Sequence, residues 1–110
     1  MSNRLINLLS NVFLPEKTFG IKRSTKWRNI RDSFLKDNPH CSFCDTVKDL
    51  QVHHVLPVHL YPQLELEIPN LMTLCPHCHF IIGHFCNWYS YNITVREDCE
   101  KFRERVKQRP

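Results

Sequence analysis

The spacing of apolar and polar residues predicts a chain of short elements. Apolar residues between positions 5 and 13 recur at helical intervals and stop before Pro15, which predicts an N-terminal helix. A second helix is predicted to begin after Ser24, whose hydroxyl can cap it, and to end before Pro39. Its apolar residues are predicted to face inward, and we expect Trp27 to belong to the core.

Two short strands are predicted in the middle of the chain. Residues 50–56 (LQVHHVL) are rich in β-branched side chains, and residues 70–74 (NLMTL) follow after a proline-rich loop. Side chains of successive strand residues point to opposite faces of a sheet. His53 and His54 are therefore predicted to face different ways unless the backbone bends between them.

Two more helices are predicted after these strands. The apolar run at 79–85 (HFIIGHF) favours a helix, and Thr94 and Glu97 have the spacing of a capping box that begins a C-terminal helix with one apolar stripe. Mixed strands and helices in this order predict an α+β fold. We divide the chain into an N-terminal helical and basic flank (1–37), a central core (38–90) and a C-terminal helix (91–110).

Length and composition limit the class of protein. The 110 residues suffice for one domain, and 42% hydrophobic with 24% charged residues excludes a disordered chain. No apolar run is long enough for a membrane span, and the first residues lack the pattern of a signal peptide. We therefore expect an intracellular, cytoplasmic protein without a membrane partner. Because so small a core buries little surface, a bound metal would add much to its stability.

The net charge of +4 is concentrated near the N-terminus. Between positions 17 and 36, Lys and Arg far outnumber the acids, of which Asp32 is the only one. Such a segment suits a polyanion such as DNA, although charged helix faces are often merely solvated. The candidates for phosphate contacts are the bases Lys22, Arg23, Lys26, Arg28 and Arg31.

Four of the six cysteines form two C-x-x-C pairs, which are Cys41, Cys44, Cys75 and Cys78. An x-x spacer lets one tight turn direct two sulfurs at the same ion, and two such turns complete a tetrahedral zinc site. Disulfide or redox chemistry is the alternative for such pairs, but it suits an oxidising compartment. Cys86 and Cys99 lack the spacing, and we expect them to be apolar packing residues.

Histidines and an asparagine accompany these cysteine pairs in the segments VHHVLP (52–57) and PNLMTLCPHCH (69–79). In this order the motifs resemble the HNH endonuclease family in its zinc-knuckle form. The resemblance runs from Cys41 to about His84. It implies a ββα-metal (His-Me finger) core, in which two strands and a helix hold one catalytic divalent ion, braced by the four-cysteine zinc site and flanked by helices.

The resemblance also implies a role for each polar residue of these motifs. His54 would be the general base, His53 and His79 would bind the catalytic ion, and Asn70 would hold the loop that orients His54. Imidazole suits the base because its ordinary pKa is about 6.5. Some relatives have a further ligand four residues after the last motif histidine, which makes His84 a third candidate ligand of the catalytic ion. His84 lies five residues after His79, however, and in an α-helix we expect this spacing to turn it away from that face.

These features predict a metal-dependent nuclease that hydrolyses DNA, nicking it or cutting both strands, with Mg²⁺, Mn²⁺, Ni²⁺ or Zn²⁺ at the catalytic site. The resemblance implies 5′-phosphate and 3′-hydroxyl products, a phage or mobile-element setting, and a homodimer or phage packaging proteins as partners. One alternative is a non-catalytic, zinc-stabilised module that binds DNA or RNA. Another is a structural zinc protein that docks through its N-terminal helix.

Overall fold

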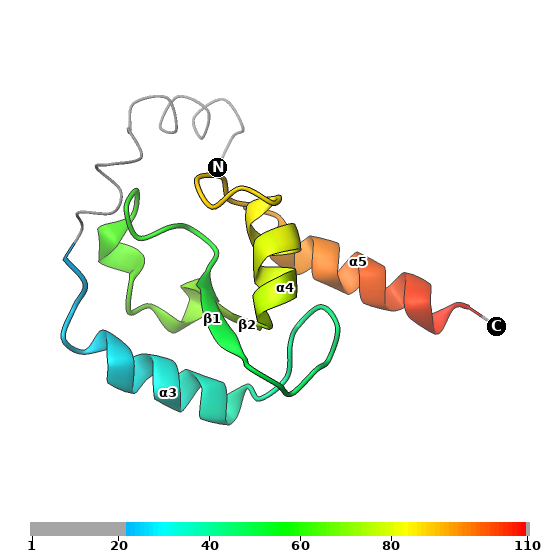
Figure 1. Cartoon of the computed structure of the whole chain (residues 1–110), viewed down its shortest axis with the longest axis horizontal. Coiled ribbons are helices and arrows are strands. Elements are labelled where there is room, and N and C mark those ends of the chain that lie inside the picture. Colours follow the sequence, from blue (N-terminus) through cyan, green and yellow to red (C-terminus); the bar gives the residue numbers. More distant parts are fainter. Residues whose placement is uncertain (1–21, 110) are drawn as a thin grey trace.

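A computed structural model describes residues 22–109, so the helix predicted at 5–13 lies outside the described residues. The described elements, in chain order, are α3 (Trp27–Asp37), β1 (Gln51–His54), the 3-10 turns η1 (Pro62–Leu64) and η2 (Ile68–Asn70), β2 (Leu71–Leu74), α4 (Pro76–Cys78), the π-helix η3 (His79–Gly83) and α5 (Val95–Lys107). Figure 1 shows the two strands between α3 and α4, with α5 extending away from them. None of the described helices is long and apolar enough to cross a membrane.

The strands β1 and β2 pair as an antiparallel hairpin in which His53 lies opposite Met72 and His54 opposite Leu71. All four residues of β2 are buried, whereas in β1 only His53 is buried, Gln51 is exposed, and Val52 and His54 are half-buried. The helical segment of α4 and η3 follows β2 directly, which completes a ββα unit. The predicted α+β fold with this unit at its centre is confirmed.

The core of the described residues is small and contains four of the six cysteines. Its buried members are Cys41, Met72, Leu74, Cys75, Cys78, Val95 and Cys99. The apolar stripe predicted for the C-terminal helix consists of Val95, Cys99, Phe102 and Val106. In α5 the first two are buried, whereas Phe102 and Val106 are 43% and 50% exposed. The outer part of α5 extends past the body of the domain, where Phe102 only stacks against Phe43 at a centroid distance of 4.2 Å.

Two predicted helix caps are absent from the described helices. α3 begins at Trp27, and the Ser24 hydroxyl accepts a hydrogen bond from the Lys26 N–H at 3.1 Å in the turn before it. The expected capping box of α5 is also wrong, because the Thr94 hydroxyl donates to Asn92 Oδ1 at 2.9 Å and makes no cap of the helix N–H groups. In both places the side chain belongs to the preceding turn.

Candidate active site

The four cysteines of the C-x-x-C pairs converge as predicted, with all four Sγ atoms within 4.8 Å of one another. The first turn is closed by a hydrogen bond from the Asp45 N–H to the Cys41 carbonyl (3.0 Å), and Asp45 has a left-handed φ of 65°. In the second turn, Cys75 Sγ accepts from the Cys78 N–H at 3.5 Å. Two sulfurs bound to one tetrahedral zinc ion at ~2.3 Å are about 3.8 Å apart, and Cys44 Sγ lies 3.8 Å from Cys75 Sγ.

The charges of these thiols favour a bound cation. Burial raises the pKa of Cys41, but backbone N–H groups of Cys44, Cys75 and Phe43 lower it more, to about 7. Burial and the neighbouring Cys75 thiol raise the pKa of Cys78. One thiolate therefore forms readily, whereas several can coexist only beside a positive ion. The donors fit structural zinc.

A second group of possible ligands consists of His53 on β1, His79 at the start of η3, and His84 just after it. One ring nitrogen of each lies within 4.8 Å of the others. His53 is 1% exposed, and neither of its ring nitrogens has a hydrogen-bond partner among residues 22–109. An unpartnered buried polar atom is costly. Ligation of an ion by one of these nitrogens would remove part of that cost.

Hydrogen bonds determine which nitrogens of His79 and His84 face the cluster. His79 Nδ1–H donates to Gln51 Oε1 at 2.9 Å, and His84 Nδ1–H donates to the Ser90 carbonyl at 2.6 Å. Each neutral ring then carries a lone pair on Nε2, and these two atoms are 3.2 Å apart. Two nitrogens bound to one tetrahedral ion at ~2.0–2.1 Å are about 3.3 Å apart. The arrangement is that of two ligands of one ion.

The protonation states of this cluster also suit a metal site, because imidazole binds metal only in its neutral form. Burial, together with the nearby His79 and His84, lowers the pKa of His53 to about 2. Burial and His84 lower the pKa of His79 to about 4, and burial lowers that of His84. All three rings are therefore neutral at neutral pH.

The expectation that His84 turns away from His79 is wrong. That expectation assumed an α-helix, whereas residues 79–83 form a π-helix, whose hydrogen bonds link residues five apart. Residue i+5 consequently returns to the face of residue i. Gly83 contributes to this packing, because a Cβ built there would lie 3.2 Å from His53 Cε1 and 3.3 Å from His79 Cδ2. The sequence hint was a glycine between two histidines.

His54, the predicted general base, points away from His53 and toward α3. Its Nε2–H donates to the Glu65 carbonyl at 2.9 Å, which leaves a lone pair on Nδ1. The Trp27 ring packs against the imidazole at a centroid distance of 4.5 Å. Trp27 is half-buried, so its expected place in the core is wrong. Burial lowers the pKa of His54, although the Glu65 carbonyl opposes this, and the ring is neutral at neutral pH.

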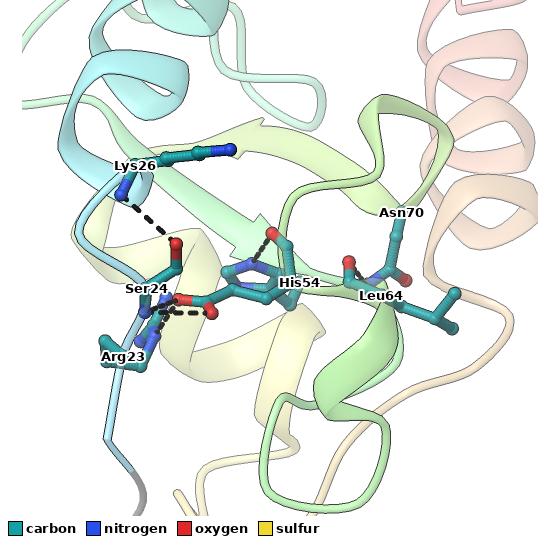
Figure 2. Close-up of polar contacts among 7 residues, drawn as sticks. Arg23, Ser24, Lys26, His54, Leu64 and Asn70 are labelled. Atoms are coloured by element: carbon teal, nitrogen blue, oxygen red, sulfur yellow. Dashed lines mark hydrogen bonds and ion pairs between the residues drawn. The ribbon is translucent and has the colours of Figure 1, made fainter.

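Asn70 lies buried at the base of the loop that carries Glu65. Its Oδ1 accepts from the Leu56 N–H at 2.8 Å, and its Nδ2 donates to the carbonyls of Leu56 (3.0 Å) and Leu64 (3.3 Å). Figure 2 shows Asn70 and Leu64 on one side of His54, with Arg23 and Ser24 on the other. Because Leu64 precedes Glu65, Asn70 anchors the stretch of backbone to which His54 is bonded.

The histidines of both groups open onto one cleft of about 770 Å³. The histidines that line it are His53, His54, His59, His79 and His84. Of the five bases predicted to contact phosphate, Arg23 and Arg31 line the cleft, and both form ion pairs, with Glu65 and Asp32. The other three, Lys22, Lys26 and Arg28, are exposed.

Several residues at this site were not found from the sequence. Gln51 lies two residues before His53 on β1, so strand alternation could have placed both on one face. Glu65 and Ser90 lie in loops, and no pattern in the sequence distinguishes them from other loop residues. Trp88 is 52% exposed, and its ring centroid lies 5.1 Å from that of His79 and 4.9 Å from that of His84.

Comparison with protein families matches residues 39–84 to the HNH endonuclease family. Searches of curated proteins and of solved structures gave no match. The matched segment contains both cysteine pairs, the strands and the histidines of the cleft, while α3 and α5 lie outside it. This similarity supports nuclease activity at the level of the family. Residues 39–84 are therefore similar to an HNH endonuclease domain.

Proposed function

We propose that this protein is a metal-dependent endonuclease that hydrolyses DNA phosphodiester bonds. His53, His79 and His84 would hold one catalytic divalent ion, and His54 would act as the general base. The observation that carries the proposal is the 3.2 Å approach of His79 Nε2 to His84 Nε2 beside the unpartnered His53 ring, on the cleft that His54 also lines.

His54 has the properties that a general base needs. Its buried ring is neutral before the reaction, and its Nδ1 lone pair can accept a proton from a water molecule. The hydrogen bond from Nε2–H to the Glu65 carbonyl becomes stronger when the ring is protonated, which stabilises the imidazolium that forms. Asn70 would act indirectly, by holding the loop that carries this carbonyl.

The two groups of ligands would serve different purposes. Three imidazoles leave coordination positions for phosphate and water, whereas four thiolates fill a tetrahedral ion and suit a structural role. When bound at the imidazoles, a divalent ion would supply Lewis-acid stabilisation of the charge that develops on the phosphate and the leaving oxygen. Imidazole ligands suit Ni²⁺ and Zn²⁺, and Mg²⁺ and Mn²⁺ stay candidates because water and phosphate oxygens would fill the remaining positions.

DNA is the substrate favoured by charge. Arg23 and Arg31 line the cleft, and the exposed bases Lys22, Lys26 and Arg28 lie on the same segment. Contacts from such bases to phosphates do not depend on sequence but weaken steeply with salt. We propose that cleavage has weak sequence preference, because contacts to phosphates carry no sequence information of their own.

Nicking of a supercoiled plasmid tests the proposal. The wild type, His54→Ala and the control His77→Ala are compared with Mg²⁺, Mn²⁺ and Ni²⁺; His77 is exposed on α4 and does not line the cleft. His54→Ala should cut about 100-fold or more slowly, the usual contribution of a general base, while binding DNA as the wild type does. Equal rates for both would refute the role of His54. If no variant cuts with any ion but all shift DNA on a gel, the nuclease proposal fails and a binding module remains.

A further inference from the structure

Glu65 has a buried carboxylate that two neighbours bind. The side chain is 8% exposed, and Oε2 lies 2.6 Å from Arg23 Nε. The Ser24 N–H lies 3.1 Å from Oε1 and 3.3 Å from Oε2. A carboxylate removed from water is stable only with such partners. Its ion pair therefore differs from an exposed pair, which contributes little.

The backbone of the same residue binds His54. The Glu65 carbonyl accepts from His54 Nε2–H at 2.9 Å, and the Glu65 N–H donates to the Pro62 carbonyl at 3.3 Å. Glu65 thus contacts the residues just before α3 through its side chain and the proposed base through its backbone. Movement of the carboxylate would move the carbonyl that selects the His54 tautomer.

The first residue of α3, Trp27, supplies the ring that packs on His54. The Trp27 N–H donates to the Ser24 carbonyl at 3.2 Å, and the Trp27 ring lies 4.5 Å from the His54 ring, between centroids. The Arg23 guanidinium carbon lies 5.1 Å from the centroid of the same Trp27 ring, within the range of a cation–π contact. One short turn therefore contacts His54 directly and through Glu65.

We infer that Glu65 is a positioning residue for His54, and that through its carboxylate the segment 23–27 completes the active site. This segment lies outside the residues that match the HNH family. The inference rests on the proposed role of His54 as general base. Glu65 does not contact the reacting atoms itself; it holds His54 in the tautomer whose Nδ1 is free to accept a proton.

Kinetics of two charge-neutralising variants test this role. Glu65→Gln keeps the side-chain volume and an oxygen for the Ser24 N–H but removes the ion pair, and Arg23→Gln removes the other partner. Because misplacing a catalytic group costs up to about 100-fold in rate, each should lower kcat about 10- to 100-fold and change KM less than about 3-fold. The double variant should resemble either single one, since both break the same interaction.

The matched control is Arg103→Gln, because the Arg103–Asp45 ion pair has the same 2.6 Å length but exposed partners, 40% and 62%. It should cut DNA at the wild-type rate. An equal loss of kcat in this control would show that any lost ion pair slows the enzyme, and would overturn the inference. A rise in KM alone for Glu65→Gln would indicate DNA binding instead of positioning, and would also overturn it.

A readout that needs no cleavage separates this inference from the proposed function. Long-range ¹H–¹⁵N spectra of protein labelled at histidine report which ring nitrogen of His54 carries the proton. The wild type and Arg103→Gln should show the Nε2–H tautomer, and Glu65→Gln a mixture of tautomers. If the wild type fails to cut DNA, the proposed function fails, yet these spectra still decide the role of Glu65. An unchanged His54 tautomer in both Glu65→Gln and Arg23→Gln would refute that role, and Arg23→Gln serves where Glu65→Gln does not fold.

Discussion

Replacement of Gly83 by alanine tests the geometry of the three-histidine cluster directly. A Cβ at this position would lie 3.2 Å from His53 Cε1 and 3.3 Å from both His53 Nδ1 and His79 Cδ2. Ordinary van der Waals contacts of a Cβ are 3.4–4 Å. His53 is buried, with 1% exposure. We therefore expect the rings of His53 and His79 to relieve the contact with the new Cβ by moving away from each other.

Two opposing effects determine how Gly83→Ala changes the stability of the protein and its affinity for a metal ion. Alanine in place of glycine favours a helix by about 0.5–1 kcal/mol. Displacing the groups around a metal ligand typically lowers metal affinity by about 10- to 100-fold, which equals about 1.4–2.7 kcal/mol. With no ion at the histidines, we expect Gly83→Ala to change the free energy of unfolding by less than about 1 kcal/mol. We expect it to weaken metal binding at the histidines by about 10-fold or more.

Calorimetric titration with Ni²⁺ of protein already loaded with zinc at the cysteines measures this affinity, because imidazole is a good ligand for nickel. The control is Ile81→Ala, at a 43% exposed position of the same π-helix. It should bind Ni²⁺ as the wild type does. If Gly83→Ala also binds Ni²⁺ within a factor of about 2 of the wild type, the close packing of Gly83 against the cluster does not control ligation, and the reasoning is refuted.

Three other predictions concern stability and zinc. Asn70→Ala removes three hydrogen bonds of a buried side chain, each of which contributes about 1 kcal/mol. Urea denaturation should therefore show that the free energy of unfolding falls by about 2–4 kcal/mol, and a fall of less than about 1 kcal/mol would contradict the anchoring role. Cys44→Ser should lose zinc and unfold, because a structural zinc site contributes on the order of 10 kcal/mol to folding. Elemental analysis should find one zinc per chain in the control Cys86→Ser, and an equal zinc content in Cys44→Ser would contradict the four-cysteine site. Because burial lowers the pKa of His53 from 6.5 to about 2, the unfolded chain takes up a proton that the folded chain does not, and stability should fall as the pH falls below about 6.5. Urea denaturation at several pH values, with no ion at the histidines, should show that stability falls less steeply with pH in His53→Gln than in the wild type. Identical slopes for the two proteins would refute the attribution to His53.

Patterns that are local in the sequence predicted much of the fold and the approximate content of the site. The spacing of Cys41 and Cys44, repeated at Cys75 and Cys78, predicted a four-thiol cluster because a C-x-x-C turn has little conformational choice. Strand alternation correctly separated the directions of His53 and His54. In both examples the residues that set the geometry are neighbours in the chain.

The rest depended on backbone forms or contacts that no local pattern specifies. His84 joins His79 only because the backbone between them is π-helical, and π-helices are rare enough that an α-helix is the natural assumption. Trp27 is apolar, but hydrophobicity alone does not distinguish a core residue from one that packs on a histidine of the cleft. Glu65 contacts Ser24 across 41 positions of the chain, so the pairing is invisible before folding.

A single peptide bond joins the two candidate ion-binding sets, because Cys78 and His79 are consecutive residues where α4 becomes η3. A displacement of the Cys78 backbone would therefore also displace His79. If the proposed function holds, chelation of zinc would consequently stop cleavage even where magnesium or manganese is plentiful. The supply of zinc would then act as a permissive signal for the proposed nuclease.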